Sequence, residues 1–180
     1  MLPDDGRDGP PRGVLVAAVI VAVAAVIGVL VFATIRQKPE GQRPVAIASV
    51  PAPHAGGDAC RALLAALPDR LGDYQRAPAA EPAPVGAAAW QADPDAEPLI
   101  LRCGVDQPVD FVAGTPIQVV DDVDWFHIGD EGRSTWITVD RPVYVALTLP
   151  DGSGPTPIQL ISAAVAEAMP AVPVNPGPVR

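Results

Sequence analysis

The chain contains two cysteines, Cys60 and Cys103, whose thiols are the strongest nucleophiles that the sequence offers. Two thiolates are too few for a structural zinc site, and neither His54 nor His127 stands at ligand spacing from them. A catalytic cysteine would need an adjacent base, for which His127 is the candidate. Two unpaired buried cysteines are a further alternative. We favour one disulfide between Cys60 and Cys103, because it uses every cysteine and suits an exported domain.

The common catalytic signatures do not occur in this sequence. We find no GxSxG, SxxK, HExxH, GxGxxG or GxxxxGK[ST] motif, which are the signatures of common hydrolases, zinc proteases and nucleotide-binding proteins. Acidic residues cluster between positions 121 and 131, but their spacing matches no EF-hand loop, so solvated turns are favoured over a calcium site. We therefore assign no catalytic residue, no metal ligand and no cofactor.

Two tryptophans, Trp125 and Trp136, fall on neighbouring strands of an expected hairpin, and His127 lies two positions after the first of them. Their rings could pack in a core or form an exposed platform for a glycan or a peptide. Arg141 follows the same hairpin. We take Trp125, His127, Trp136 and Arg141 together as the candidate binding surface.

The charge of the chain limits its partners. Its net charge is −9, and residues 44–180 hold seven arginines against 17 acidic side chains. Such a domain repels phosphate backbones, which excludes nucleic acid as a partner, and it repels anionic lipid surfaces. For Arg102 and Arg141 we favour pairing with a buried carboxylate such as Asp140 over the binding of an anionic ligand.

Residues 13–35 form an apolar run of 23 residues without a charge. About 20 such residues cross the hydrocarbon core of a bilayer, so we predict a transmembrane helix, with the cytoplasmic membrane as its partner. A cleaved signal peptide is the alternative, but its apolar core is usually about 7 to 15 residues long. Residues 1–12 are too short to fold and are predicted to form a cytoplasmic head. The acidic, cysteine-containing domain would then be extracytoplasmic.

The remaining chain is predicted to contain a linker, one α+β domain at residues 58–170, and a disordered tail at residues 171–180. Residues 36–57 are rich in proline and glycine, which is typical of a flexible linker. Apolar residues at helical spacing predict two flanking helices, one on each side of the strands in sequence. Alternating apolar residues predict a small antiparallel sheet of four to five strands, at 99–105, 117–120, 124–128, 134–140 and 143–149.

The predicted domain resembles a family of actinobacterial single-pass membrane-anchored proteins whose domain has no known function. The resemblance covers roughly residues 58–170. It implies one N-terminal span and an extracytoplasmic domain, and it supplies no activity and no catalytic residue. It is carried by the segments AAWQADPDAEPLILRCGVDQP, DDVDWFHIG, STWITVDRPVYVALTLP and IQLISAAVAEAMP, and by the order of Cys60, Trp90, Arg102-Cys103-Gly104, Trp125 and Asp140-Arg141.

These observations predict a membrane-anchored, extracytoplasmic binding or accessory protein of the actinobacterial cell envelope. Its partner would be an envelope protein or a component of the cell wall. No enzymatic activity is predicted from the sequence. The alternative is a hydrolase-like envelope enzyme whose site has no recognisable motif, with His127 as its candidate base.

Overall fold

The computed structural model describes residues 12–36, 42–130 and 132–179. The chain divides into two compact units, residues 1–41 and residues 42–180. The predicted cytoplasmic head, residues 1–12, lies outside the described residues except for its last position.

Unit 1 contains one helix, α1 (Arg12–Arg36), whose described side chains are apolar and exposed. Those side chains lie between residues 13 and 28. Within the described residues, no helix is long and apolar enough to cross a membrane. The predicted transmembrane helix at residues 13–35 is therefore not supported, and that part of the predicted fold is wrong.

Unit 2 is built on an eight-stranded antiparallel sheet with the order β1-β2-β3-β4-β8-β7-β6-β5. Two four-stranded meanders meet where β4 pairs with β8. The prediction of a sheet with four to five strands is therefore wrong. The strands are β1 (Arg70–Leu71), β2 (Tyr74–Ala77), β3 (Ala87–Gln91), β4 (Leu99–Val105), β5 (Ile117–Val120), β6 (Val123–Asp130), β7 (Arg133–Thr138) and β8 (Tyr144–Pro150).

The strands that the prediction lacks are β1, β2 and β3. The sequence of β3 is AAAWQ, and alanine has a low strand propensity and gives no alternating pattern. Both faces of β3 are nevertheless buried, with Ala89 on one face and Trp90 on the other. Pairing with β4 and burial on both faces make this segment a strand, and neither is visible in its own residues.

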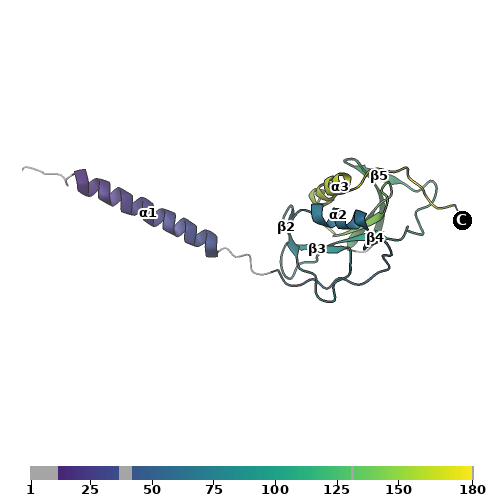
Figure 1. The fold of residues 1–180 in the computed structure, drawn as a ribbon, viewed down its shortest axis with the longest axis horizontal. Helices are drawn as coiled ribbons and strands as arrows, with labels where there is room; N and C mark the ends of the chain where they lie inside the picture. The colour runs from purple at the N-terminus through teal and green to yellow at the C-terminus, as the bar shows by residue number, and fades with distance from the viewer. Residues whose placement is uncertain (1–11, 37–41, 131, 180) are drawn as a thin grey trace, which may run out of the picture. The chain divides into compact units, whose positions relative to one another are not determined.

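Both helices of unit 2, α2 (Asp58–Ala66) and α3 (Thr156–Ala168), pack side by side on one face of the sheet (Figure 1). In each helix, apolar side chains three and four positions apart form one stripe, and this stripe packs against the strands. Pro157 lies in the first turn of α3, where a residue needs no N–H donor within the helix. The core between the helices and the sheet includes Cys60, Leu63, Trp90, Leu101, Cys103, Trp125, Val145, Leu147, Ile161 and Val165.

The opposite face of the sheet is covered in part by irregular chain. Val45 and Ile47 are buried against the alanines of β2 and β3, and the Val45 N–H donates to the Pro78 carbonyl at 2.8 Å. This part of the predicted flexible linker is therefore packed on the domain. Short extended segments of this kind give no periodic signal, so proline content alone suggested a free linker.

The C-terminal segment is also attached to unit 2. The Val172 N–H donates to the Asp140 carbonyl at 2.8 Å, and the Gly177 N–H donates to the Phe111 carbonyl at 2.9 Å. Residues 171–179, which the sequence predicts to be disordered, are therefore bound to unit 2 by backbone hydrogen bonds. Residue 180 lies outside the described residues. Backbone hydrogen bonds to a loop supply this order, and they do not depend on side-chain pattern.

The bulge in β4 at Gly104 allows residues 54 and 55 to lie against this strand. Gly104 has a φ of +84°, and the His54 N–H donates to its carbonyl at 3.2 Å. A Cβ atom at this position would lie 2.3 Å from the Ala55 nitrogen, which is well inside contact distance. Only glycine fits here.

Candidate functional site

Cys60 on α2 and Cys103 on β4 form a disulfide with their Cα atoms 5.6 Å apart. Both residues are fully buried in the core between the helices and the sheet. The structure thus confirms the predicted disulfide. These sulfur atoms are bonded to each other and shielded from solvent, so they serve as a covalent link and provide no nucleophile.

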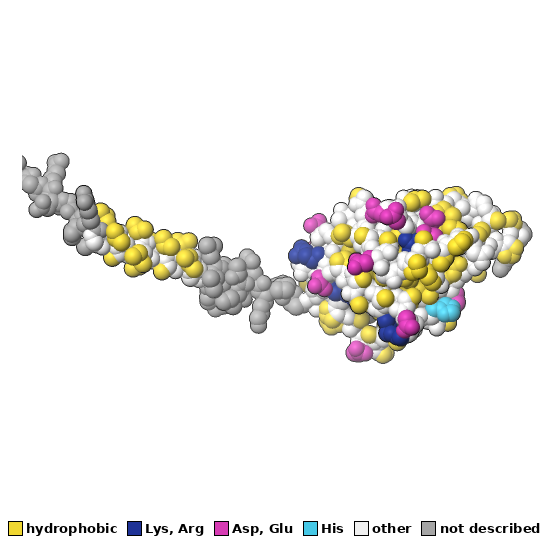
Figure 2. Space-filling view, turned by 45° about the horizontal axis from the view of Figure 1, so that its top comes forward, with side chains coloured by type: hydrophobic (Ala, Val, Ile, Leu, Met, Phe, Trp, Pro, Cys, Tyr) yellow, Lys and Arg dark blue, Asp and Glu magenta, His cyan; other side chains and the backbone are white. Residues whose placement is uncertain are grey.

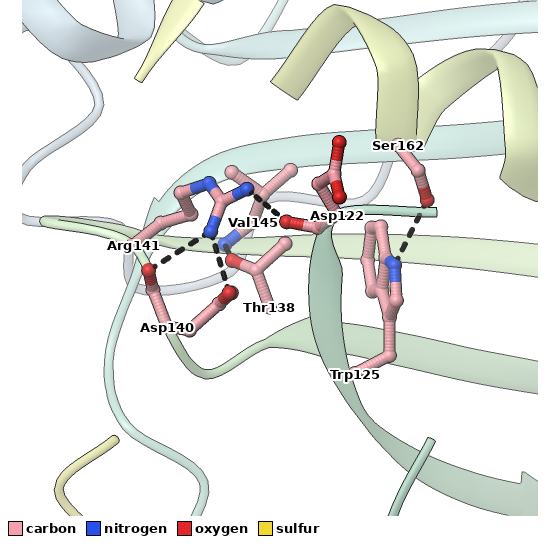
Figure 3. Close-up of polar contacts among 7 residues, drawn as sticks. All are labelled: Asp122, Trp125, Thr138, Asp140, Arg141, Val145 and Ser162. Carbon is pink, nitrogen blue, oxygen red and sulfur yellow. Dashed lines mark hydrogen bonds and ion pairs between the residues drawn. The ribbon is translucent and has the colours of Figure 1, made fainter. Parts of the chain in front are cut away.

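The four residues of the predicted binding surface do not lie together on the surface. Trp125 is fully buried beneath α3, and its indole N–H donates to the Ser162 hydroxyl at 3.0 Å (Figure 3). Trp125 pairs across the hairpin with Thr138, whereas Trp136 pairs with His127. Trp125 is therefore a core residue, as the core-packing alternative of the sequence analysis expected, and it is not part of an exposed platform.

Arg141 is also buried, and its guanidinium is held by the chain around it (Figure 3). It donates to the Asp140 carboxylate at 2.5 Å, to the Asp140 carbonyl at 3.1 Å and to the Asp122 carbonyl at 2.6 Å. Burial raises the pKa of Asp140, and the nearby charge of Asp124 adds to this, while a hydrogen bond from the Asp124 backbone and the Arg141 guanidinium act in the opposite direction. Arg141 is thus a structural ion-pair partner, and no ligand can reach it in this arrangement.

His127 and Trp136 form the exposed part of the predicted surface. Their ring centroids are 4.5 Å apart and the ring planes are tilted by 38°. Trp136 is partly exposed and His127 is exposed, while the Trp136 indole N–H donates to the Ser134 hydroxyl at 3.2 Å. The register of β6 and β7 therefore places one stacked aromatic pair at the solvent boundary, with Trp136 packed against the edge of the core.

A cavity of about 490 Å³ lies beside Trp136, between the end of β5, the β8–α3 loop and the first turn of α3. This volume is within the usual range of about 300–1,000 Å³ for small-molecule sites. Its apolar lining includes Val120, Trp136, Leu149, Pro150 and Ile158, and its polar lining includes Asp121, Ser134, Asp151, Ser153 and Gln159. We refer to it as the Trp136 cavity.

The lining of the Trp136 cavity is aromatic and polar, with carboxylates as its only charged groups among the described residues. It offers one aromatic ring, two carboxylates, two hydroxyls and one amide, and none of the described residues that line it is a lysine, arginine, histidine or cysteine. Such a site can stack against an apolar ring face and exchange hydrogen bonds with hydroxyl groups. Anionic ligands would be repelled. The sequence signal for the cavity is the loop DGSGP, which joins a strand to a helix.

A second concave region lies on the opposite face of the sheet, next to Arg102 of β4. Its volume is about 450 Å³, and it is lined by β4, β7 and β8 together with Val50, Pro51, Asp106 and Pro108. We call it the Arg102 groove. Strand alternation in LILRCGV already places Arg102 on the face opposite Leu101 and Cys103, and this signal was not used in the prediction.

The negative charge of unit 2 is spread over its surface. Figure 2 shows acidic side chains at several separate places on the visible face of the domain, with no single acidic patch. Among the described residues, no group of three or more His, Cys, Asp or Glu side chains is arranged to hold a metal ion. Asp121 and Asp122 form the β5–β6 turn and are exposed.

Residues 19–174 match the model of a family described as "Protein of unknown function (DUF3515)". The match spans most of the chain, so this protein belongs to that family. It establishes a domain of unknown function and does not by itself indicate an actinobacterial source or a membrane anchor. No curated protein and no solved structure matches the chain.

Proposed function

We propose that this member of a family of unknown function is an extracytoplasmic binding or accessory module of the actinobacterial cell envelope. The buried Cys60–Cys103 disulfide supports the location, because disulfides persist in oxidising compartments outside the cytoplasm. The use of Lys38 as the only lysine among 12 basic residues supports a GC-rich genome, as in actinobacteria. The strongly acidic domain argues for a partner that is not polyanionic.

The observation that carries the proposal is the Trp136 cavity. An indole face beside hydroxyl, amide and carboxylate groups is complementary to a sugar ring, which has apolar C–H faces and a rim of hydroxyl groups. The absence of a cation from the described lining argues against acidic or phosphorylated sugars. We therefore propose a neutral glycan of the cell wall as the ligand of this site.

Tryptophan fluorescence can test this proposal on the full-length chain. Trp90 and Trp125 are fully buried, so acrylamide should quench mainly the partly exposed Trp136. Addition of soluble, uncharged cell-wall glycan chains should protect this emission from the quencher. Trp136→Ala should weaken binding, measured by calorimetry, about fivefold, because an aromatic contact contributes about 1 kcal/mol and 1.4 kcal/mol corresponds to a factor of ten.

The matched control is Ile128→Ala. Ile128 is an exposed apolar residue of the same hairpin, but its cross-strand partner is Thr135, on the face away from Trp136. This variant should bind glycan like the wild type. Failure of every neutral glycan to bind the wild-type chain would refute the proposal. Cleavage of the glycan that is lost in His127→Ala would replace it with the envelope-enzyme alternative.

A further inference from the structure

Among the residues that the structure describes, Arg102 has no acidic partner. Its Nη2 donates to the Ala48 carbonyl at 3.3 Å, and its Nε is buried without an acceptor in that part of the chain. The buried Arg141, in contrast, contacts the Asp140 carboxylate. Within the described residues no carboxylate lies within ion-pair distance of Arg102, so the predicted pairing with a buried carboxylate holds for Arg141 and fails for Arg102.

The surroundings of Arg102 make this lack of a partner costly. The guanidinium is half-buried, and burial lowers its pKa. Arginine stays charged in proteins in spite of such a shift, so a partly desolvated positive charge faces the Arg102 groove. An oxyanion in the groove would replace the lost water, and a carboxylate matches the planar fork of the guanidinium.

The rest of the groove defines what must be attached to that carboxylate. Its walls are largely apolar and include Val50, Pro51, Val105, Pro108, Ile137 and Ala146. The hydroxyls of Thr135 and Thr148, which lie 3.1 Å apart, form one small polar area on this sheet surface. An apolar body of small to medium size would therefore cover this surface.

The groove also contains a carboxylate, Asp106, which makes no ion pair with Arg102. A simple anion would be repelled by Asp106 and by the net negative charge of the domain. A zwitterion has no net charge, and it could direct its carboxylate to Arg102 and its ammonium group to Asp106. Charge complementarity thus selects a ligand with both charges.

We propose that the Arg102 groove binds a short apolar peptide with free termini, whose carboxylate pairs with Arg102 and whose ammonium group lies toward Asp106. This site is on the sheet face opposite the Trp136 cavity. The proposal is independent of the proposed glycan function.

A set of analogues tests the proposal on the full-length wild-type chain. Leucyl-leucine is the probe, and its N-acetylated form and its C-terminal amide remove one charge each. Calorimetry or NMR titration should show binding of the free dipeptide, at least a tenfold weaker affinity for the amide, and a smaller, several-fold loss for the N-acetylated form, because Asp106 is exposed. Equal affinity for the dipeptide and its amide would overturn the proposal, as would no binding of any of the three.

Variants separate the two charges of the groove. Arg102→Gln should weaken dipeptide binding at least tenfold, and Asp106→Asn should remove the difference between the free and the N-acetylated dipeptide. Arg61→Gln is the matched control, because Arg61 is an exposed arginine whose contacts are to Asp58 and Gly56. Dipeptide affinity unchanged in Arg102→Gln would refute the assignment. Trp136→Ala should leave dipeptide binding intact, so failure of the glycan proposal and failure of this one are distinguishable.

Discussion

Removal of the disulfide should destabilise unit 2 by about 4 kcal/mol, whichever cysteine is replaced. The bond joins residues 43 positions apart in the sequence. The loop-closure entropy of a loop of this length, −2.1 − 1.5R ln n cal/mol/K, corresponds to about 4 kcal/mol at 25 °C. Domains of this size are stable by about 5–15 kcal/mol, so the loss is a large share of the total.

The variants are Cys60→Ala, Cys103→Ala and the double replacement, because alanine adds no polar group to the buried core around both residues. Each single variant breaks the same bond, so the double variant should differ from either by only about 1 kcal/mol. The two single losses should therefore not add. Reduced wild-type protein should resemble the double variant.

Urea unfolding of the full-length chain, followed by tryptophan emission, measures these differences. Trp90 and Trp125 are buried in the same core as the disulfide and report its exposure. At a slope of about 2 kcal/mol per molar urea, a loss of 4 kcal/mol moves the midpoint by about 2 M, and the slope should rise because the unfolded chain is no longer cross-linked. Additive losses in the double variant, or two thiols that react with maleimide in unreduced protein, would refute the reasoning.

Two further predictions concern single positions. Gly104→Ala should lower the free energy of unfolding in urea by more than about 3 kcal/mol, because a Cβ would lie 2.3 Å from the Ala55 nitrogen. Gly152→Ala, with a φ of +78° and open space around it, should lower it by only about 1–2 kcal/mol. Equal losses would contradict the close approach at Gly104. Since burial raises the pKa of Asp140, the native state binds its proton more tightly than the unfolded state, whose pKa is about 3.9. The free energy of unfolding of the wild type, relative to that of Asp140→Asn, should therefore fall as pH rises from about 4 through the native pKa of Asp140, in spite of the Arg141 contact. If this difference rises with pH instead, the ionised pair stabilises the fold and the reasoning is wrong.

The sequence alone was sufficient for the features that depend on local pattern. Alternation of apolar residues located segments that overlap β4 to β8, and helical spacing located α2 and α3. The count of two cysteines and their context predicted the disulfide that the structure contains. Each of these features is encoded within a few neighbouring residues or in a simple count.

The tertiary structure decided the features that depend on pairing between distant segments. β3 is a strand because β4 lies beside it, and residues 45–47 are buried because the sheet offers them a surface. The register of β6 and β7 set Trp136 opposite His127 and left Trp125 under α3, which the hairpin sequence does not specify.

The two arginines show the same limit most clearly. From the sequence, Arg102 and Arg141 have the same expected role, which is pairing with a buried carboxylate such as Asp140. Arg141 contacts its own neighbour Asp140, whereas Arg102 projects from β4 to the other face of the sheet, where no carboxylate of the described residues lies within ion-pair distance. Whether a buried charge is paired depends on which segments converge around it, and that is determined by the topology of the sheet.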